Sequence, residues 1–114
     1  MAAIERFEDI KAWQMARELT HALYETTKGT AFARDYGLCD RVTQASGSIM
    51  HNIADRFDSE TNGDLFRFLE YAKRSCIEGQ SELYVALDLK HIDEQALGRL
   101  YALSGETRAA SWDS

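Results

Sequence analysis

The sequence predicts an all-α protein, an antiparallel up-down-up-down four-helix bundle. Three observations lead to this fold class. Apolar residues recur at steps of three and four along most of the 114 residues, no proline interrupts these stretches, and only short polar links separate them. Short links between long helices favour antiparallel neighbours. We therefore expect one domain over residues 1–114, with helices at about 8–27, 37–58, 62–90 and 93–109.

The first helix, at 8–27, begins with the acidic residues Glu8 and Asp9, which suit the positive end of a helix dipole, and Gly29 is a natural stop. We expect its buried face to centre on Trp13. The members of that face are Phe7, Ile10, Trp13, Ala16, Thr20, Leu23 and Tyr24. In the link that follows, Phe32 and Tyr36 are expected to anchor the chain on the bundle.

The second and third helices, at 37–58 and 62–90, form the hairpin around which the chain is organised. Each carries one apolar stripe at helical spacing. The stripes are Leu38, Val42, Ala45, Ile49 and Ile53 on the first arm, and Leu65, Leu69, Ala72, Cys76, Gly79 and Leu83 on the second. Gly47 costs the helix about 1 kcal/mol against alanine. We therefore expect a packing reason for it, the close approach of another helix.

The fourth helix, at 93–109, starts at Asp93, a suitable N-cap. Its apolar side is short, comprising Ala96, Leu97, Leu100 and Leu103. The pattern weakens at Ser104 and Gly105, so residues 110–114 are expected to form a frayed tail.

The composition is that of a soluble globular protein, with 45% apolar and 28% charged residues. No window approaches the roughly 18 consecutive apolar residues of a membrane span, so no membrane association is expected. Acidic residues near the N-terminus replace the apolar run of a signal peptide, which predicts a cytoplasmic protein. Cys39 and Cys76 lie in helical patterns and are expected to be reduced packing residues.

The formal charge is −6, from 19 acidic and 13 basic residues. Proteins that grip nucleic acid through phosphates usually carry the opposite balance on at least one face. Lys73 and Arg74 form the only adjacent basic pair. The charge therefore disfavours a general nucleic-acid binder, although a local basic patch stays possible.

The third helix, at 62–90, carries a second seam at steps of three and four. Its members are Phe68, Tyr71, Ser75, Glu78, Glu82, Val85 and Leu89. Two interpretations are open: the helix contacts two neighbours inside the bundle, or this face meets another subunit. The mixture of aromatic and charged residues resembles a wet interface more than a dry core.

The register of the hairpin places polar residues opposite one another. With a turn near Thr61, Arg41 lies level with Glu82, Gln44 with Glu78 and Ser48 with Ser75. We expect an interface or a polar seam that sets the register between helices or subunits. Its candidate residues are Arg41, Ser48, Asn52, Asp55, Phe68, Tyr71, Ser75, Glu78 and Glu82. The alternative is a ligand or catalytic pocket at the same place.

Metal and catalytic sites are not expected. Glu18 and His21 match the spacing of a di-iron ligand motif, and Asp88 and His91 resemble it. Glu18, however, points away from the Trp13 face, and His91 falls where its helix ends. The sequence contains no phosphate-binding loop and no nucleophile elbow. We predict no catalytic residue, no metal and no cofactor.

Several short stretches spread over roughly residues 7–89 carry a resemblance to a known family. They are Phe7 to Gln14 with Ala16 and Leu19, then Tyr36 to Leu38, Ser48-Ile49, Asn52 to Asp55, Phe68-Leu69, Ala72, Ser75 and Glu78. With these residues the chain resembles a bacterial family, the four helix bundle protein family. The members of this family were first noted as proteins encoded within intervening sequences of large-subunit ribosomal RNA genes. The accessory variability determinant of diversity-generating retroelements belongs to the same group. The chain departs from the family at Gln44, Met50, Asp55 and Arg56, where Arg, Pro, Glu and Gly are usual.

The resemblance implies an up-and-down bundle that assembles into a homopentameric ring. In the retroelement branch it also implies binding to nucleic acid and to a reverse transcriptase. We therefore expect a non-enzymatic homo-oligomer that acts as a scaffold or interaction module, with itself as partner. The alternative is a nucleic-acid-binding accessory protein of the retroelement or ribosomal RNA intervening-sequence type.

Overall fold

The computed structural model describes residues 6–28, 31–58 and 62–112, apart from the side chains of 56–58, 62–66, 68, 69 and 112. Four long helices dominate: α1 (Lys11–Thr27), α3 (Tyr36–Asp58), α4 (Asn62–Asp88) and α5 (Glu94–Trp112). Two short helices precede the first two of them, η1 (Phe7–Asp9) and α2 (Ala31–Arg34). The bundle measures 45 × 23 × 19 Å.

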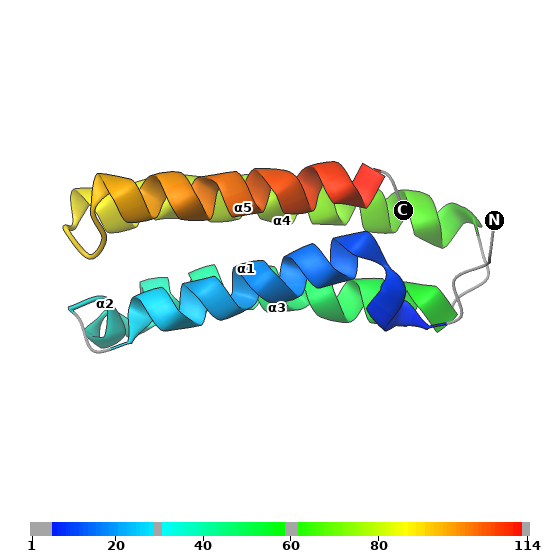
Figure 1. Ribbon diagram of the computed structural model, residues 1–114, viewed down its shortest axis with the longest axis horizontal. Coiled ribbons are helices and arrows are strands. Elements are labelled where there is room, and N and C mark those ends of the chain that lie inside the picture. The colour runs from blue at the N-terminus through cyan, green and yellow to red at the C-terminus, as the bar shows by residue number, and fades with distance from the viewer. Residues whose placement is uncertain (1–5, 29–30, 59–61, 113–114) are drawn as a thin grey trace.

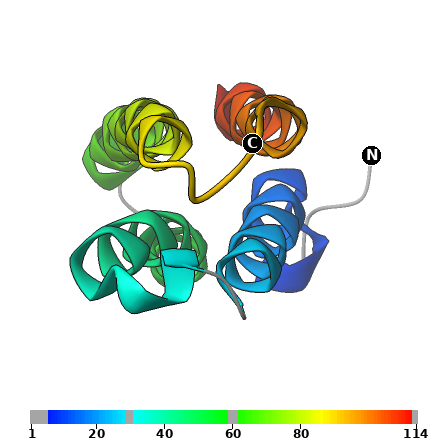
Figure 2. The same ribbon diagram turned by 90° about the vertical axis from the view of Figure 1, so that its left-hand side faces the viewer.

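Each long helix packs along two others, α1 and α4 each on both α3 and α5. The four run lengthwise, and successive helices reverse direction (Figure 1). Seen from one end, they occupy the corners of a square (Figure 2). This confirms the predicted all-α, up-down-up-down bundle. In the described part of the chain, no helix is both long and apolar enough to span a bilayer.

The apolar stripes of the central hairpin form the core, as predicted. Leu38, Val42, Ile49 and Ile53 of α3 are buried, and so are Ala72, Cys76 and Leu83 of α4. They belong to two clusters along the bundle axis, one with Ala12 and Ala16 of α1, the other with Leu19 and Leu23. The predicted stripe residues Leu65 and Leu69 lie outside the described side chains.

The first helix differs from the prediction in its start and in its buried face. Ile10 is extended (φ −76°, ψ 124°) and separates η1 from α1, so the long helix begins at Lys11. The buried residues of α1 are Ala12, Met15, Ala16, Leu19, Leu23 and Thr27.

Trp13 lies at the rim of this face, and Tyr24 is exposed. The Trp13 ring meets Phe7 edge to face with a centroid separation of 5.3 Å, and the Arg17 guanidinium lies 5.6 Å from its centroid. Small residues occupy the centre of the face instead. Ala12 and Ala16 are fully buried there, and their small side chains let the neighbouring helices pack closely on α1.

The expectation of a frayed tail was wrong for residues 110–112, because α5 continues to Trp112, and the rest of the expected tail, 113–114, lies outside the described residues. Its buried face continues from Leu100 through Ser104, Thr107 and Ser111. Thr107 and Ser111 donate hydrogen bonds to carbonyls one turn earlier, and Ser104 donates to the Cys76 carbonyl of α4 at 3.2 Å. These hydroxyls are satisfied, so they pack like small apolar groups although their residues read as polar.

Two further expectations are settled in the links and in α3. Phe32 of α2 is fully buried, as predicted, whereas Tyr36 is 76% exposed and does not pack into the bundle among the described residues. A Cβ atom at Gly47 would meet no heavy atom within 4 Å. Among the described residues, no other helix approaches α3 closely at Gly47. The expected packing reason for this glycine is therefore wrong for a single copy of the chain.

Candidate interaction surface

A groove runs between α3 and α4 on the outside of the bundle. It is open to solvent and has a volume of about 280 Å³. Its walls consist of Arg41, Gln44, Ala45 and Ser48 from α3, and Tyr71, Ser75, Glu78 and Glu82 from α4. The α4 residues recur at steps of four, three and four, and the α3 residues fall within two turns, with Gln44 and Ala45 adjacent, so each helix presents one edge to the groove.

Two contacts cross the groove between its walls. The Tyr71 phenol donates a hydrogen bond to Ser48 Oγ at 3.0 Å. Arg41 Nε lies 3.6 Å from Glu82 Oε1, in the register that the hairpin predicts. Ser75 is buried at the floor. The groove is therefore held by one hydrogen bond and one long ion pair, and the second of these is partly solvated.

Glu82 is the electrostatic centre of the groove. Its side chain is 24% exposed, and its Oε2 atom is buried with no hydrogen-bond partner among the described residues. Burial raises the pKa of the Glu82 carboxyl, Arg41 opposes this shift, and Glu78 adds to it. Arg41 is itself 62% exposed, so water screens its attraction for the carboxylate. The groove holds more negative charge than its own cation neutralises.

The expected seam residues Glu78, Asn52 and Asp55 make no polar contact across the groove within the described part of the chain. Glu78 is exposed and makes no hydrogen bond or ion pair within the described part of the chain, to Gln44 or to any other residue. Asn52 is half-buried, and its amide donates to the Ser48 carbonyl of its own helix at 2.7 Å. Asp55 is exposed and does not line the groove. The side chain of Phe68 lies outside the described residues.

The rest of the second seam is exposed along α4 and, at Leu89, just past its end. Tyr71, Val85 and Leu89 are 41%, 45% and 53% exposed, although all three are large and apolar or aromatic. They follow the α3 flank of the helix, whereas Ser75 and Glu82 of the same seam turn inward. Each interpretation of the seam therefore fits some of its residues. One part of the seam contacts a neighbouring helix within the bundle, and another part is uncovered.

A second apolar patch lies on the opposite flank of α4, and the sequence analysis did not predict it. Ile77 and Tyr84 are exposed there, and Tyr84 packs edge to face on Tyr101 of α5 with ring centroids 6.1 Å apart. The seven-residue spacing of Ile77 and Tyr84 could have indicated a shared face. The partner Tyr101 could not be inferred, because it depends on the packing of α5.

A separate cluster joins the two links at one end of the bundle. His91 Nε2 hydrogen-bonds Asp35 Oδ2 at 3.1 Å, and its ring stacks on Phe32 with centroids 5.3 Å apart. Asp35 also accepts the Leu38 amide at the start of α3. Both hydrogen bonds lower the pKa of the Asp35 carboxyl, that from His91 more strongly. The cluster clasps α2 to the turn between α4 and α5, where Lys90 has a positive φ of 62°.

Metal ligation finds no geometric support in the ranges that the structure describes. No three His, Cys, Asp or Glu side chains gather there as a metal site would require. Glu18 and His21, the pair with di-iron spacing, are both exposed on α1.

A comparison with known families agrees with this architecture and with the resemblance noted in the sequence. The model of the 23S rRNA-intervening sequence protein family matches residues 8–110, which takes in all four long helices except the last residues of α5. No curated protein and no solved structure matches the chain. Because the match covers most of the chain, the protein belongs to the 23S rRNA-intervening sequence protein family.

Proposed function

We propose that this protein is a non-enzymatic module that works by association, and that it self-associates through the outward surface of α4. One observation carries the proposal. Among the described residues, α4 and the residue directly after it expose five large side chains, each between 41% and 53% exposed: Tyr71, Ile77, Tyr84, Val85 and Leu89. Large apolar side chains that are exposed together along one helix mark an interaction surface more often than they mark an ordinary solvent-exposed surface.

The distribution of these side chains supports a protein partner. They lie on both flanks of one helix, with the polar groove of Arg41 and Glu82 along one of them. Aromatic residues surrounded by polar groups are typical of protein interfaces. We propose a homo-oligomer, and the homopentamer that the family resemblance implies is the first form to test.

The groove supports an interaction role rather than catalysis. Its Ser48 hydroxyl already accepts the Tyr71 phenol, and no histidine lines it. An activated serine needs an adjacent general base. The hydroxyls of this groove therefore act as structural hydrogen-bonding groups in the proposed function.

Sedimentation velocity of the wild-type chain and of charge variants tests the proposal. Val85→Glu and Tyr84→Glu should dissociate the assembly, because each places an unpaired charge in an apolar contact. Tyr36→Glu is the matched control: this tyrosine is also exposed, but it lies in the first turn of α3, where an acidic residue suits the helix dipole. A wild-type chain that stays monomeric at micromolar concentration refutes self-association.

Nucleic-acid binding is the second candidate, and one observation favours it: the family is described by a ribosomal RNA intervening sequence. The net charge of −6 opposes it. Binding of structured RNA should be titrated with salt, since phosphate contacts weaken steeply as salt rises. Affinity that is absent at low salt removes this candidate.

A further inference from the structure

The groove between α3 and α4 contains one positive charge fewer than its negative charges require. Two carboxylates, Glu78 and Glu82, lie one turn apart on α4, and Arg41 is the one cation among the described residues that lines the groove with them. Arg41 reaches only Oε1 of Glu82, leaving the buried Oε2 without a donor in the described part of the chain. A buried acceptor without a partner costs free energy. A second cation beside Glu78 and Glu82 would offset the negative charge of this partly buried pair that Arg41 leaves uncompensated.

The shape and the walls of the groove suit a guanidinium group. The hollow of about 280 Å³ is open to solvent, so a long side chain can enter from outside. A guanidinium presents several N–H donors in one plane and can bridge two carboxylates. The exposed ring of Tyr71 forms part of the wall and can pack against the same group.

Arg99 of α5 is a cation that suits this groove in a second copy. It is exposed and makes no hydrogen bond, ion pair or ring contact with any described residue. Gln80 Nε2 donates to the Tyr101 carbonyl at 3.4 Å, which places residues 80 and 101 side by side. Because α4 and α5 are antiparallel, Arg99 lies at the height of Glu82 along the bundle.

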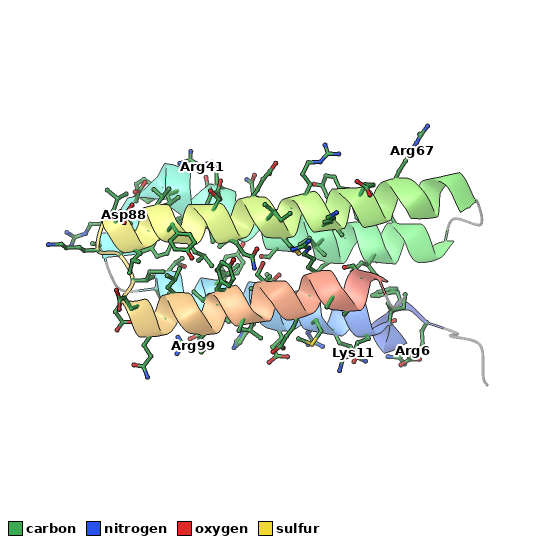
Figure 3. The ribbon with its side chains drawn as sticks, turned by 90° about the horizontal axis from the view of Figure 1, so that it is seen from above. Arg6, Lys11, Arg41, Arg67, Asp88 and Arg99 are labelled. Atoms are coloured by element: carbon green, nitrogen blue, oxygen red, sulfur yellow. The ribbon has the colours of Figure 1, made fainter. Side chains whose placement is uncertain are left out.

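The position of Arg99 also suits a contact between copies. Arg41 and Arg99 project from opposite edges of the bundle near the same end, whereas Lys11 and Arg6 lie toward the other end (Figure 3). Arg17 of α1 already lies over the Trp13 ring. A rotation about an axis parallel to the bundle keeps heights unchanged, so it can bring Arg99 of one copy level with the groove of the next.

We infer that Arg99 of one copy inserts into the α3–α4 groove of a second copy and binds Glu82 and Glu78 there. The inference rests on the self-association proposed above and names the contact that completes the groove. The two surfaces differ, so the contact is heterologous, and each copy can give one arginine and receive another.

Charge reversal tests the contact by sedimentation equilibrium. Arg99→Glu and Glu78→Arg should each raise the dissociation constant at least about tenfold, since each places like charges together. The double variant, with Arg99→Glu and Glu78→Arg in one chain, should restore the constant to within about threefold, because the pair is re-formed in reverse. Glu78 is chosen because Glu82 also pairs with Arg41 of its own chain.

Arg34→Glu is the control, an exposed arginine on α2 that has no partner among the described residues. Circular dichroism of every variant establishes that the helices are retained, and Arg99→Gln provides a milder version of the change. If the wild type assembles but Arg99→Glu behaves like Arg34→Glu, or the double variant is not restored, the arginine contact is refuted and self-association stands. If the wild type is monomeric, the proposed function itself fails.

Discussion

Replacement of Gly79 by alanine should stabilise the protein. Gly79 lies inside α4, beside a small internal cavity of about 20 Å³ between the helices. A Cβ atom at this position would meet no heavy atom within 4 Å, so nothing has to move to admit it. The walls of this cavity include Leu19, Ile49 and Leu83, which are buried core residues.

Two contributions set the expected size of the effect. Alanine is favoured over glycine in a helix by about 1 kcal/mol. The added methyl group gains up to about 0.8 kcal/mol for its burial. The free energy of unfolding should therefore rise by about 1–1.8 kcal/mol, which for a domain of this size is roughly 4–7 °C in Tm.

Gly98→Ala separates the two contributions. Gly98 lies inside α5, is exposed, and also leaves a Cβ atom without neighbours within 4 Å. It should gain the helix term of about 1 kcal/mol and no burial term. Urea unfolding of both variants at one protein concentration measures the difference. Gly79→Ala that destabilises the protein, or that gains no more than Gly98→Ala, would refute the reasoning about the cavity.

Three other substitutions and one labelling experiment examine the remaining polar groups. Asn52→Ala should change the free energy of unfolding, measured in urea, by less than about 0.5 kcal/mol. Among the described residues, its half-buried amide makes its hydrogen bond within α3. A larger loss would indicate an additional partner. The lowered pKa of Asp35 means that its contribution is present above the usual pKa of aspartate and is lost as pH falls through the folded value, so Asp35→Asn should reduce the acid-induced loss of Tm. An unchanged acid profile would contradict this. Glu82 should change stability with pH in the opposite direction. Because its pKa is raised in the fold, the folded state gains stability as pH falls through that value toward the usual pKa of glutamate, and Glu82→Gln should remove this gain. A variant that keeps the gain would assign it to another group. Burial raises the pKa of Cys76 to about 11, so at pH 8 only about one thiol in a thousand is ionised, and a thiol reagent should label the half-buried Cys39 first and Cys76 only on unfolding. Equal labelling rates in the folded protein would be inconsistent with that burial.

Much of the fold was predictable because it depends on neighbours along the chain. The hairpin of α3 and α4 follows from apolar residues one turn apart, such as Leu38, Val42 and Ile49, and they are buried as expected. The same spacing places Arg41 opposite Glu82, since the length of the turn sets the register of antiparallel helices. The candidate groove was predictable to this extent.

Prediction from the sequence was wrong where the polarity of a residue and its burial in the bundle disagree. Ser104, Thr107 and Ser111 read as polar, yet they lie on the buried face of α5 because their hydroxyls find carbonyl partners at once. Tyr36 reads as an anchor, yet it is exposed. Whether a polar residue is satisfied is decided by the carbonyls near it, and the spacing of residues does not reveal those.

Periodicity along the chain therefore specifies the helices, their antiparallel order and the stripes that join them. Only the packed bundle fixes which side chains remain uncovered or unpaired. Examples are the buried Oε2 of Glu82 without a partner among the described residues, the pairing of Tyr84 with Tyr101, and the height of Arg99 beside α4. Periodicity is local and repeats every turn, so it survives in the sequence. Exposure depends on which faces the other helices cover, and that is a property of the assembled bundle.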